Sequence, residues 1–351
     1  MAPCHTDDVT ALAMNSDRTK VASGQVGLAP AVFIWNAETA EMLHNFKLPK
    51  GSRAVTAIGF SEDSSMIACA DLSDKHNVYI YQISGASPKL LKTETSGPDK
   101  ILHLAWNQAK GIDAAFCTVG PNHCCFWSPA LETKKKKGNN KLTDEQGKPY
   151  ATLNYACVTY NGKTAYTGGS KGEVIVWEGA SAMLDPQIHT SVIHCIKFVK
   201  TLMNGEELEI CITGSKDARI VLSNVKKNFE KIREMATTDT FARSVDMLGT
   251  KLLAGLRNGR IIYKDLGRVE DIKDANKHNV LVYSHHEGEV WGLCEMAGSE
   301  LFVTSGDDNK IIKWSVGKKQ CLELCKIQAK PAEVAKSKKA GFKGGASTLS
   351  S

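Results

Sequence analysis

The segment LFVTSGDDNKIIKWS combines a hydroxyl group, a carboxylate and an indole at short spacing. With a histidine pair about one strand and one loop upstream, the polar candidates are His285, His286, Ser305, Asp308 and Trp314. The indole N–H, the serine hydroxyl, a histidine ring and the carboxylate can form one buried chain of hydrogen bonds. A buried charge is stable only when its hydrogen-bonding groups are satisfied, so the four types must occur together. The set therefore predicts a structural tetrad, which should not be counted as an active site.

Other residues that could do chemistry do not form a complete site. His123, Cys124 and Cys125 lie beside Trp127, but a zinc site needs further ligands at suitable spacing, and no second cysteine pair follows. Strand alternation places His123 and Cys125 on one face and Cys124 on the other, which favours core packing over a metal site. The sequence also has no nucleophile elbow and no phosphate-binding loop. We therefore expect no catalysis, no cofactor and no metal.

Two lysine-rich segments are candidates for binding an acidic partner. The chain has 44 basic and 38 acidic residues, a formal charge of +6, and most of the excess lies in residues 128–150 and 326–351. The candidate lysines are Lys134, Lys135, Lys136, Lys137, Lys141, Lys336, Lys338, Lys339 and Lys343. We expect both segments to lie outside the strands, where they could bind an acidic protein surface or phosphates. A lysine-rich loop that simply stays solvated is an equally good interpretation.

The opening segment recurs along the chain in weaker copies. The residues at the position of its tryptophan are Trp35, Tyr81, Trp127, Trp177, Ser223, Lys264 and Trp314, at spacings of 46, 46, 50, 46, 41 and 50 residues. Each copy contains short, mostly alternating apolar strands and turn residues, at a period slightly longer than the about 40–45 residues of a propeller blade. The sequence predicts an all-β fold, a single seven-bladed WD-repeat β-propeller over residues 1–328, followed by a flexible basic tail over residues 329–351. We expect Lys264, in the sixth copy, to be exposed.

The copies keep the tetrad to different extents. The first has His5, Ser23 and Trp35; the fourth has Thr167 and Trp177 with Lys171 at the aspartate offset; the fifth has His189, Thr213 and Asp217 with Ser223 in place of the tryptophan. Degenerate blades still fold, because each blade buries its faces against its neighbours.

Closure of the ring is a separate question. WD-repeat rings usually close when the N-terminus supplies the outermost strand of the last blade, but only Met1–Cys4 precede the first histidine. The segment KQCLELCKIQ, after Trp314, can supply that strand from the C-terminal side. The two ends of the ring would then lack the usual interlock, unless a missing upstream segment or a partner chain supplies it.

The first two copies resemble a particular propeller family. The runs HTDDVTALAMNSDRTKVASGQV, VFIWNAETAEML and RAVTAIGFSEDSSMIACADLSDKHNVYIY are similar to the first two blades of the echinoderm microtubule-associated-protein-like family. Matching positions are His5, Asp7, Asp8, Val9, Gly24, Gln25, Ile34, Trp35, Arg53, Ala54, Val55, Phe60, Ser61 and Asp74. The later runs TGGSKGEVIVWEG and EVWGLCEM continue the likeness, which covers about residues 5–325.

This resemblance implies a non-catalytic scaffold that binds tubulin or neighbouring microtubule proteins in the cytoskeleton, with the axoneme of a cilium or flagellum as one such place. The chain departs from the family, because the hydrophobic motif that precedes the first propeller and the second propeller are missing. A binding mode that needs two propellers is therefore in doubt. The alternative function is a general protein-interaction platform without direct tubulin contact. No apolar run is long enough for a membrane helix, and no cluster of stacking aromatics favours nucleic acid, so neither partner is expected.

Overall fold

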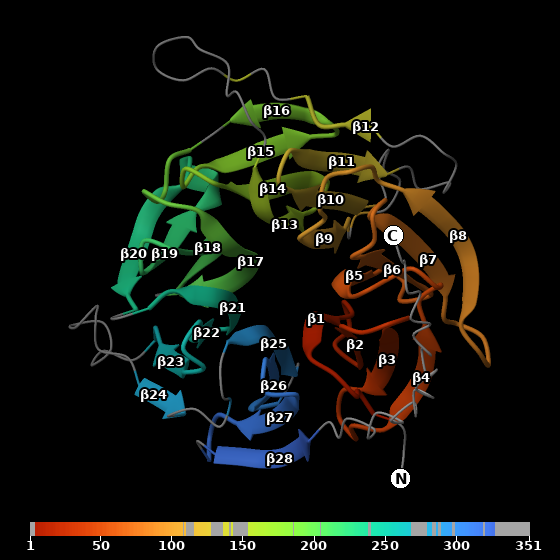
Figure 1. Ribbon diagram of the computed structural model, residues 1–351. Coiled ribbons are helices and arrows are strands. Elements are labelled where there is room, and N and C mark those ends of the chain that lie inside the picture. The colour runs from red at the N-terminus through yellow and green to blue at the C-terminus, as the bar shows by residue number, and fades with distance from the viewer. Residues whose placement is uncertain are drawn as a thin grey trace, which may run out of the picture.

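Each sequence copy forms one four-stranded antiparallel sheet in the computed structural model, and seven such sheets stand around a ring (Figure 1). The fold is therefore the seven-bladed propeller that the repeat predicts. The structure describes residues 4–107, 109, 116–127, 136–139, 142, 154–184, 186–203, 205–237, 240–267, 279–282, 286, 289–296, 299–318 and 320–326.

The first four blades are built from sixteen strands in chain order. These are β1 (Val9–Met14), β2 (Lys20–Gln25), β3 (Ala31–Asn36) and β4 (Met42–Lys47); β5 (Val55–Phe60), β6 (Met66–Asp71), β7 (Asn77–Gln82) and β8 (Lys89–Thr95); β9 (His103–Trp106), β10 (Phe116–Gly120), β11 (His123–Trp127) and β12 (Lys136–Lys137); β13 (Tyr155–Asn161), β14 (Thr164–Gly169), β15 (Val174–Glu178) and β16 (Ser181–Leu184).

The last three blades follow the same order. They contain β17 (Ile193–Met203), β18 (Glu206–Ser215), β19 (Arg219–Asn224) and β20 (Glu230–Ala236), with the 3-10 turn η1 (Val225–Lys227) after β19; β21 (Ala242–Leu248), β22 (Lys251–Leu256), β23 (Ile261–Asp265) and β24 (Asn279–Val282); and β25 (Val290–Met296), β26 (Leu301–Gly306), β27 (Lys310–Ser315) and β28 (Gln320–Lys326). No helix among these described residues is long and apolar enough to cross a membrane.

The first strand of each blade lies at the centre of the ring and the fourth lies at the rim (Figure 1). We call the face where the chain runs into each first strand, and where each second strand turns into the third, the upper face. The opposite face is the lower face. All seven positions aligned with Trp314 lie in third strands.

The ring closes between blade 7 and blade 1. β28, from the C-terminal side, is the outermost strand of blade 7, and β1 packs directly against β25. Two polar contacts cross this seam. Arg18 lies 3.3 Å from Glu295, and the Lys313 ammonium donates a 2.9 Å hydrogen bond to the Glu38 carbonyl oxygen.

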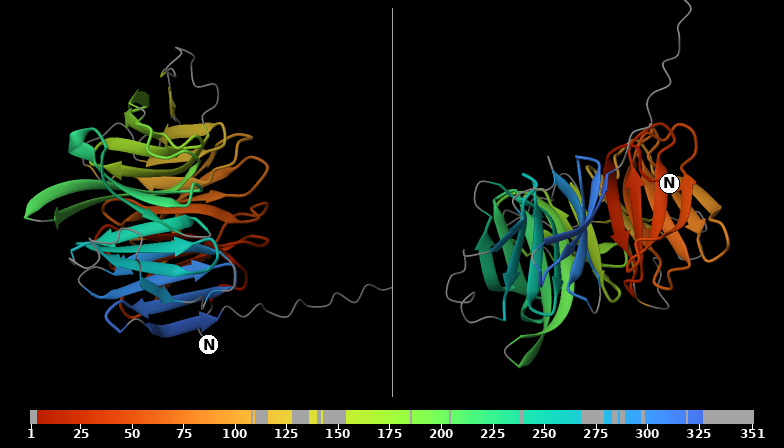
Figure 2. Two further views of the ribbon diagram at one scale, coloured as in Figure 1. Left: turned by 90° about the vertical axis from the view of Figure 1, so that its left-hand side faces the viewer. Right: turned by 90° about the horizontal axis from the view of Figure 1, so that it is seen from below.

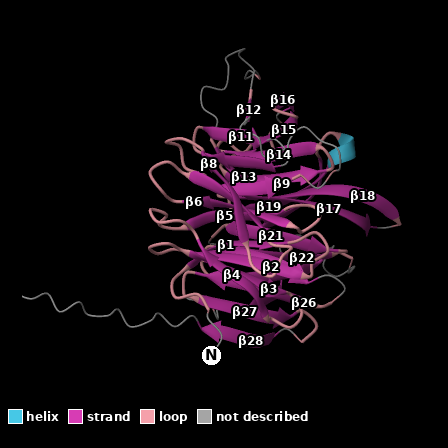
Figure 3. Cartoon of the chain, turned by 90° about the vertical axis from the view of Figure 1, so that its right-hand side faces the viewer, coloured by secondary structure: helices cyan, strands magenta, loops and turns pink. Residues whose placement is uncertain are grey.

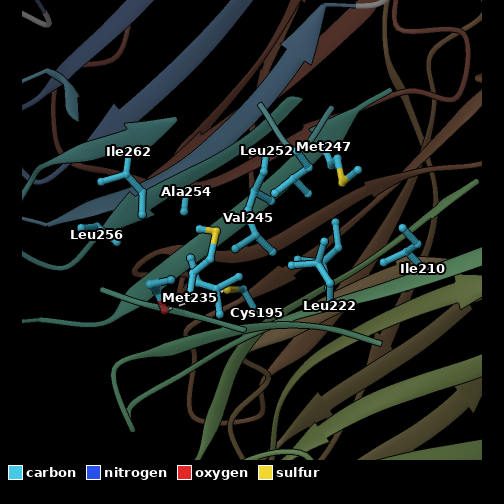
Figure 4. Packing of buried hydrophobic residues seen from close by; sticks show 14 of the residues in the cluster. Cys195, Ile210, Leu222, Met235, Val245, Met247, Leu252, Ala254, Leu256 and Ile262 are labelled. Atoms are coloured by element: carbon cyan, nitrogen blue, oxygen red, sulfur yellow. Dashed lines mark hydrogen bonds between the residues drawn. The ribbon is translucent and has the colours of Figure 1, made fainter. Parts of the chain in front are cut away.

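The hydrophobic core consists of separate clusters between adjacent blades. Figure 4 shows the cluster between blades 5 and 6, where Leu222 and Ile210 meet Val245 and Met247 across the gap. Small residues near the end of the second strand allow this approach. A Cβ atom on Gly168 would lie 2.7 Å from Ile193 of the next blade. A Cβ on Gly24 would likewise lie 2.6 Å from Val55, so glycine here permits blade-to-blade contact.

Two features depart from the regular blade. Lys264 was expected to be exposed, and this is wrong, because the residue is only 1% exposed in the middle of β23. A third strand lies between two strands of its own sheet, and the adjacent blades cover its two faces, so its side chains are covered whatever their type. The hairpin of β17 and β18 is longer than the others and projects beyond the lower face (Figures 2 and 3). Near its tip the Thr201 hydroxyl donates to the Gly249 carbonyl oxygen, at 2.9 Å, and Leu202 is exposed.

Replacing Gly168 with alanine tests the contact between blades. The added methyl group would overlap Ile193 and Cys157, so we expect the free energy of unfolding to fall by about 1–3 kcal/mol. The matched control is Gly85→Ala, because the nearest atom to a Cβ there is 3.8 Å away. That change should alter stability by less than about 0.5 kcal/mol. Urea denaturation of both variants measures the difference, and an equal loss would contradict this packing.

Candidate functional site

The tetrad of blade 7 is a continuous chain of four side chains. The Trp314 indole N–H donates to the Thr304 hydroxyl oxygen at 2.6 Å, and that oxygen lies 2.8 Å from Nε2 of His286. Nδ1 of His286 lies 2.8 Å from Asp308. Because a carboxylate only accepts, Nδ1 donates to Asp308, and Nε2 pairs with the Thr304 hydroxyl. The histidine and the tryptophan are buried, so these groups hold the blade together.

The sequence analysis placed Ser305 in this tetrad, and that assignment is wrong. Thr304 pairs with Ile312 and shares a sheet face with Trp314, whereas Ser305 pairs with Ile311 and points to the other face. Ser305 is buried, and its hydroxyl finds no hydrogen-bond partner among the residues that the structure describes. A one-residue slip in register moves a side chain to the opposite face, which explains the error. His285, the other candidate, lies outside the described residues.

Related chains of hydrogen bonds occur in other blades. The tryptophan indole donates to a hydroxyl group in blades 1, 3 and 4, through the pairs Trp35–Ser23 at 2.8 Å, Trp127–Thr118 at 2.9 Å and Trp177–Thr167 at 2.9 Å. In blade 5, Nε2 of His189 lies 2.8 Å from the Thr213 hydroxyl and Nδ1 lies 3.0 Å from Asp217. Burial alone would raise the pKa of Asp217, but hydrogen bonds from Arg219 and the Thr190 amide, with His189, lower it to about 2.

Two substitutes for the tetrad were missed by sequence reasoning. In blade 3, Nε2 of His123 lies 2.8 Å from the Thr118 hydroxyl, so the ring comes from the same hairpin and not from the preceding loop. In blade 2, the fully buried Asp71 accepts hydrogen bonds from Ser52 and Tyr79, at 2.6 and 3.0 Å. The signal available in the sequence for both substitutes was a polar residue and a hydroxyl residue within the same predicted sheet. The alternating burial pattern alone could not reveal it.

The inner strands surround a channel that the tetrads do not reach. Two cavities of about 410 and 210 Å³ lie along it. Several residues that line them carry buried polar atoms without a hydrogen-bond partner in the described part of the chain, among them Thr56 Oγ1, His194 Nε2, Arg243 Nε and Ser244 Oγ. Buried polar atoms are nearly always paired in folded proteins, so these groups are available to water or to a bound molecule.

A stack of aromatic and guanidinium groups forms the upper mouth of this channel. The Arg243 guanidinium carbon lies 4.4 Å from the centre of the Trp291 ring and 5.7 Å from that of Phe241. Arg257 lies over the same Phe241 ring at 5.6 Å. Both arginines share one carboxylate, with Glu289 2.7 Å from Arg243 and 2.9 Å from Arg257. Two guanidinium groups and the Glu289 carboxylate thus meet here, and the Asp307 carboxylate, which accepts from the Trp291 indole, lies beside them.

His194 extends the stack into the channel. Its ring stacks on Phe241, with 4.8 Å between the ring centres and 16° between the planes. Burial lowers the pKa of His194 to about 4, and the charges of Arg243 and Lys216 lower it further in the same direction. The ring is therefore neutral at pH 7, with its Nε2 atom turned to no partner among the described residues.

The lower end of the channel carries paired charges. Arg18 lies 3.3 Å from Glu295, and Lys197 lies 3.4 Å from Asp246. Burial and the nearby Asp246 raise the pKa of Glu295 to about 7, against the opposite effect of Arg18. The lower end therefore carries two ion pairs, and the charge of Glu295 in one of them changes with pH near neutrality.

Only two of the nine candidate lysines lie within the described residues. Lys136 and Lys137 were expected outside the strands, and this is wrong, because they form β12 and pair with Phe126 and Cys125 at the edge of blade 3. Lysine is common on edge strands, where its charge discourages pairing with another chain. Lys137 is exposed. Positions outside the described residues hold Lys134, Lys135, Lys141, Lys336, Lys338, Lys339 and Lys343.

Within the described ranges, no group of three or more histidine, cysteine, aspartate or glutamate residues is placed to hold a metal ion. The strand cysteines Cys69, Cys117, Cys157, Cys195, Cys211 and Cys294 are buried free thiols.

Comparison with known proteins agrees with this architecture. Residues 4–263 match the family model described as the echinoderm microtubule-associated protein first beta-propeller. The chain belongs to this family. Residues 277–315 match the WD domain, G-beta repeat. The family and the fold are those of WD-repeat propeller scaffolds.

Two individual proteins are similar to the chain over most of its length. It is 34% identical over 348 residues to the ciliary WD repeat-containing protein ctxp80 of Euplotoides octocarinatus, covering 98% of this chain and 44% of that protein. It is 27% identical over 322 residues to the 77 kDa echinoderm microtubule-associated protein of Strongylocentrotus purpuratus, covering 88% of this chain and 44% of that protein. The chain thus spans less than half the length of these relatives. The computationally designed Ika8 protein, with a TM-score of 0.60 over 92% of this chain and 87% of its own but 16% identity, shares the fold.

Two neighbouring hydroxyl residues of β26 should differ in their effect on stability. Thr304→Val removes the group that links Trp314 to His286, and we expect a loss of about 1–3 kcal/mol in the free energy of unfolding. Ser305→Ala removes a buried hydroxyl without a partner in the described structure and should cost less than about 0.5 kcal/mol. Chemical denaturation distinguishes the two. A larger loss for Ser305→Ala would show that our register of the tetrad is wrong.

His5 makes the propeller sensitive to acid. It is fully buried, with Ser23 at 2.6 Å and Gln25 at 2.9 Å, and burial lowers its pKa from 6.5 to about 4. Between about pH 4 and pH 6.5 the His5 side chain is protonated in the unfolded chain and unprotonated in the folded chain. Stability contributed by His5 is therefore complete above pH 6.5 and is lost as pH falls toward 4, by at most about 1.4 kcal/mol per pH unit.

Unfolding curves at pH 7.5, 6 and 5 measure this dependence. His5→Asn should be less stable at pH 7.5 and should show a flatter decline on acidification. The control His44→Asn, on the outer strand β4, should keep the wild-type slope. An unchanged slope in His5→Asn would mean that another group causes the acid sensitivity.

Proposed function

We propose that this chain is a non-catalytic scaffold of microtubules that binds tubulin or a neighbouring microtubule protein, with cilia or flagella as a place of action. The observation that carries the proposal is the likeness of nearly the whole chain, 98% of it, to a ciliary WD-repeat protein at 34% identity. The match of residues 4–263 to the family's first propeller supports the same function. A cytoplasmic location on the cytoskeleton follows from it.

The histidines of the tetrads support a scaffold over an enzyme. Both ring nitrogens of His5, His189 and His286 lie within hydrogen-bonding distance of side chains of their own blade. A catalytic histidine needs one nitrogen facing a substrate, which these rings do not offer. The polar sets that first suggested chemistry therefore serve the fold. We extend this to the whole propeller, which we assign to residues 1–328, with residues 329–351 as a basic tail.

Positive charge supports an acidic partner. Exposed Lys137 lies at the edge of blade 3, beside the lysine run in the sequence, and Arg257 is exposed at the upper mouth. Basic groups at the surface attract an acidic protein through long-range forces that salt screens.

Co-sedimentation with polymerised tubulin tests the proposal. We expect the full chain to pellet with microtubules at low salt and to be released as salt rises, with weaker binding to microtubules stripped of their acidic tails. Replacing Lys134, Lys135, Lys136 and Lys137 with glutamine should reduce pelleting. The control replaces four exposed lysines of blades 1 and 2, Lys47, Lys50, Lys75 and Lys89, and changes the charge equally. No pelleting of the wild-type chain under any condition would refute the function.

A general interaction platform is the second candidate. Three large apolar side chains are exposed near the upper face: Leu28 at 92%, Leu102 at 44% and Trp291 at 37%. Such side chains are frequent anchors in protein interfaces. Retrieval of stable partners from cytosol freed of microtubules, without pelleting on pure tubulin polymers, favours the platform over the microtubule scaffold.

A further inference from the structure

The upper mouth between blades 5, 6 and 7 is a built arrangement of groups from distant parts of the chain. Phe241 and Arg243 come from the start of blade 6, Arg257 from the turn between β22 and β23, and Trp291 from the start of blade 7. A backbone bond from the Arg257 amide to the Phe241 carbonyl oxygen, at 3.0 Å, fixes two of these segments together. The stack therefore has a defined geometry before any partner arrives.

Trp291 is held in an exposed position by polar contacts. Its indole N–H donates to Oδ1 of Asp307, and Oδ2 of the same carboxylate accepts a 3.1 Å bond from the Glu289 amide. The Asp307 amide in turn donates to the Glu289 carbonyl oxygen at 3.0 Å. A large apolar side chain that is 37% exposed and fixed in this way offers a contact surface with little entropy to lose.

The Arg257 guanidinium is the group that can bind a carboxylate of a partner. Its side chain is 57% exposed, and only Nε is used, in the contact with Glu289. Among the described residues, its two terminal nitrogens have no recorded partner. Guanidinium groups bind carboxylates through two parallel hydrogen bonds, which need such an open pair of nitrogens. Behind it, Nε2 of the neutral His194 ring and the Arg243 Nε atom lie at the cavity without partners.

The charges around the mouth favour one orientation of a bound partner. Lys216, Arg243 and Arg257 lie on the side of blades 5 and 6, against the single carboxylate of Glu289. Asp7, Asp8 and Asp307 lie on the side of blades 7 and 1, where burial and mutual repulsion raise the pKa of Asp8. A carboxylate of the partner is thus drawn to the side of Arg257 and repelled from the other side.

We propose that this mouth binds an acidic peptide segment of a partner protein, with a carboxylate on Arg257 and a neighbouring aromatic or aliphatic side chain on the exposed face of Trp291. The inference rests on the proposed function in taking the partner to be a protein, and it adds the site and the chemistry of recognition. The site is distinct from the lysine run of blade 3.

Fluorescence anisotropy with a labelled peptide of five glutamates, a tyrosine and five glutamates tests the site on the full chain without tubulin. We expect saturable binding that salt weakens, and binding at least about tenfold weaker for the same peptide with glutamine in place of glutamate. Arg257→Gln should weaken binding of the acidic peptide about tenfold. The matched control Lys89→Gln removes the same charge from an exposed position on β8 and should change binding less than about twofold.

Arg257→Lys keeps the charge but cannot present two parallel donors, so its affinity should fall between wild type and Arg257→Gln. Melting curves establish that each variant is folded. Equal weakening by Arg257→Gln and Lys89→Gln, or no binding of the acidic peptide at all, would overturn the proposal. Tighter binding of a labelled thymidine decanucleotide, lost in Arg257→Gln, would also overturn it in favour of a phosphate-bearing ligand. Because no tubulin is present, failure here leaves the co-sedimentation result to stand or fall separately.

Discussion

Close packing between the second strand of each blade and the first strand of the next holds the ring together. The position after the tetrad hydroxyl faces the neighbouring blade, and it is Gly24 in blade 1, Gly168 in blade 4 and Gly214 in blade 5. A methyl group at any of these three positions would approach the next blade within 3 Å. Everything nearer the centre depends on this spacing, because it sets how far the first strands stand from one another around the channel.

The seam between blades 7 and 1 shows how the ring closes without a shared strand. Ser305 occupies the small-residue position there, and an apolar cavity of about 150 Å³ lies between Leu12, Trp35 and Val303. Trp35 is half-buried, whereas Trp177 and Trp314 are almost fully buried at the equivalent position. Closure therefore rests on strand packing between β1 and β25 and on a few polar contacts.

The architecture could be predicted from the sequence because each copy of the repeat contains residue types that a blade needs. The positions aligned with Trp314 all lie in third strands, and KQCLELCKIQ, the segment that could supply the outer strand of blade 7, contains β28. The predictions were wrong where they depended on the placement of a single residue. Ser305 and Thr304 both carry hydroxyl groups, and only strand pairing shows which one faces Trp314. Lys264 was judged by its charge, although its place in a covered strand decides its burial.

The candidate site at the upper mouth could not be read from the sequence. Trp291 lies in the run EVWGLCEM, but Phe241 and Arg257 lie in none of the runs quoted above, and the three meet only because the ring brings two strand starts and one turn to the same place. Together, the two proposals predict that a microtubule protein presents an acidic segment to this mouth. Hydrogen exchange of the full chain, with and without microtubules, tests that claim most directly. The account predicts slower amide exchange over residues 240–244, 256–260 and 289–292 in the bound state. Protection confined to the outer strands or the lower face, with these segments unchanged, would contradict it.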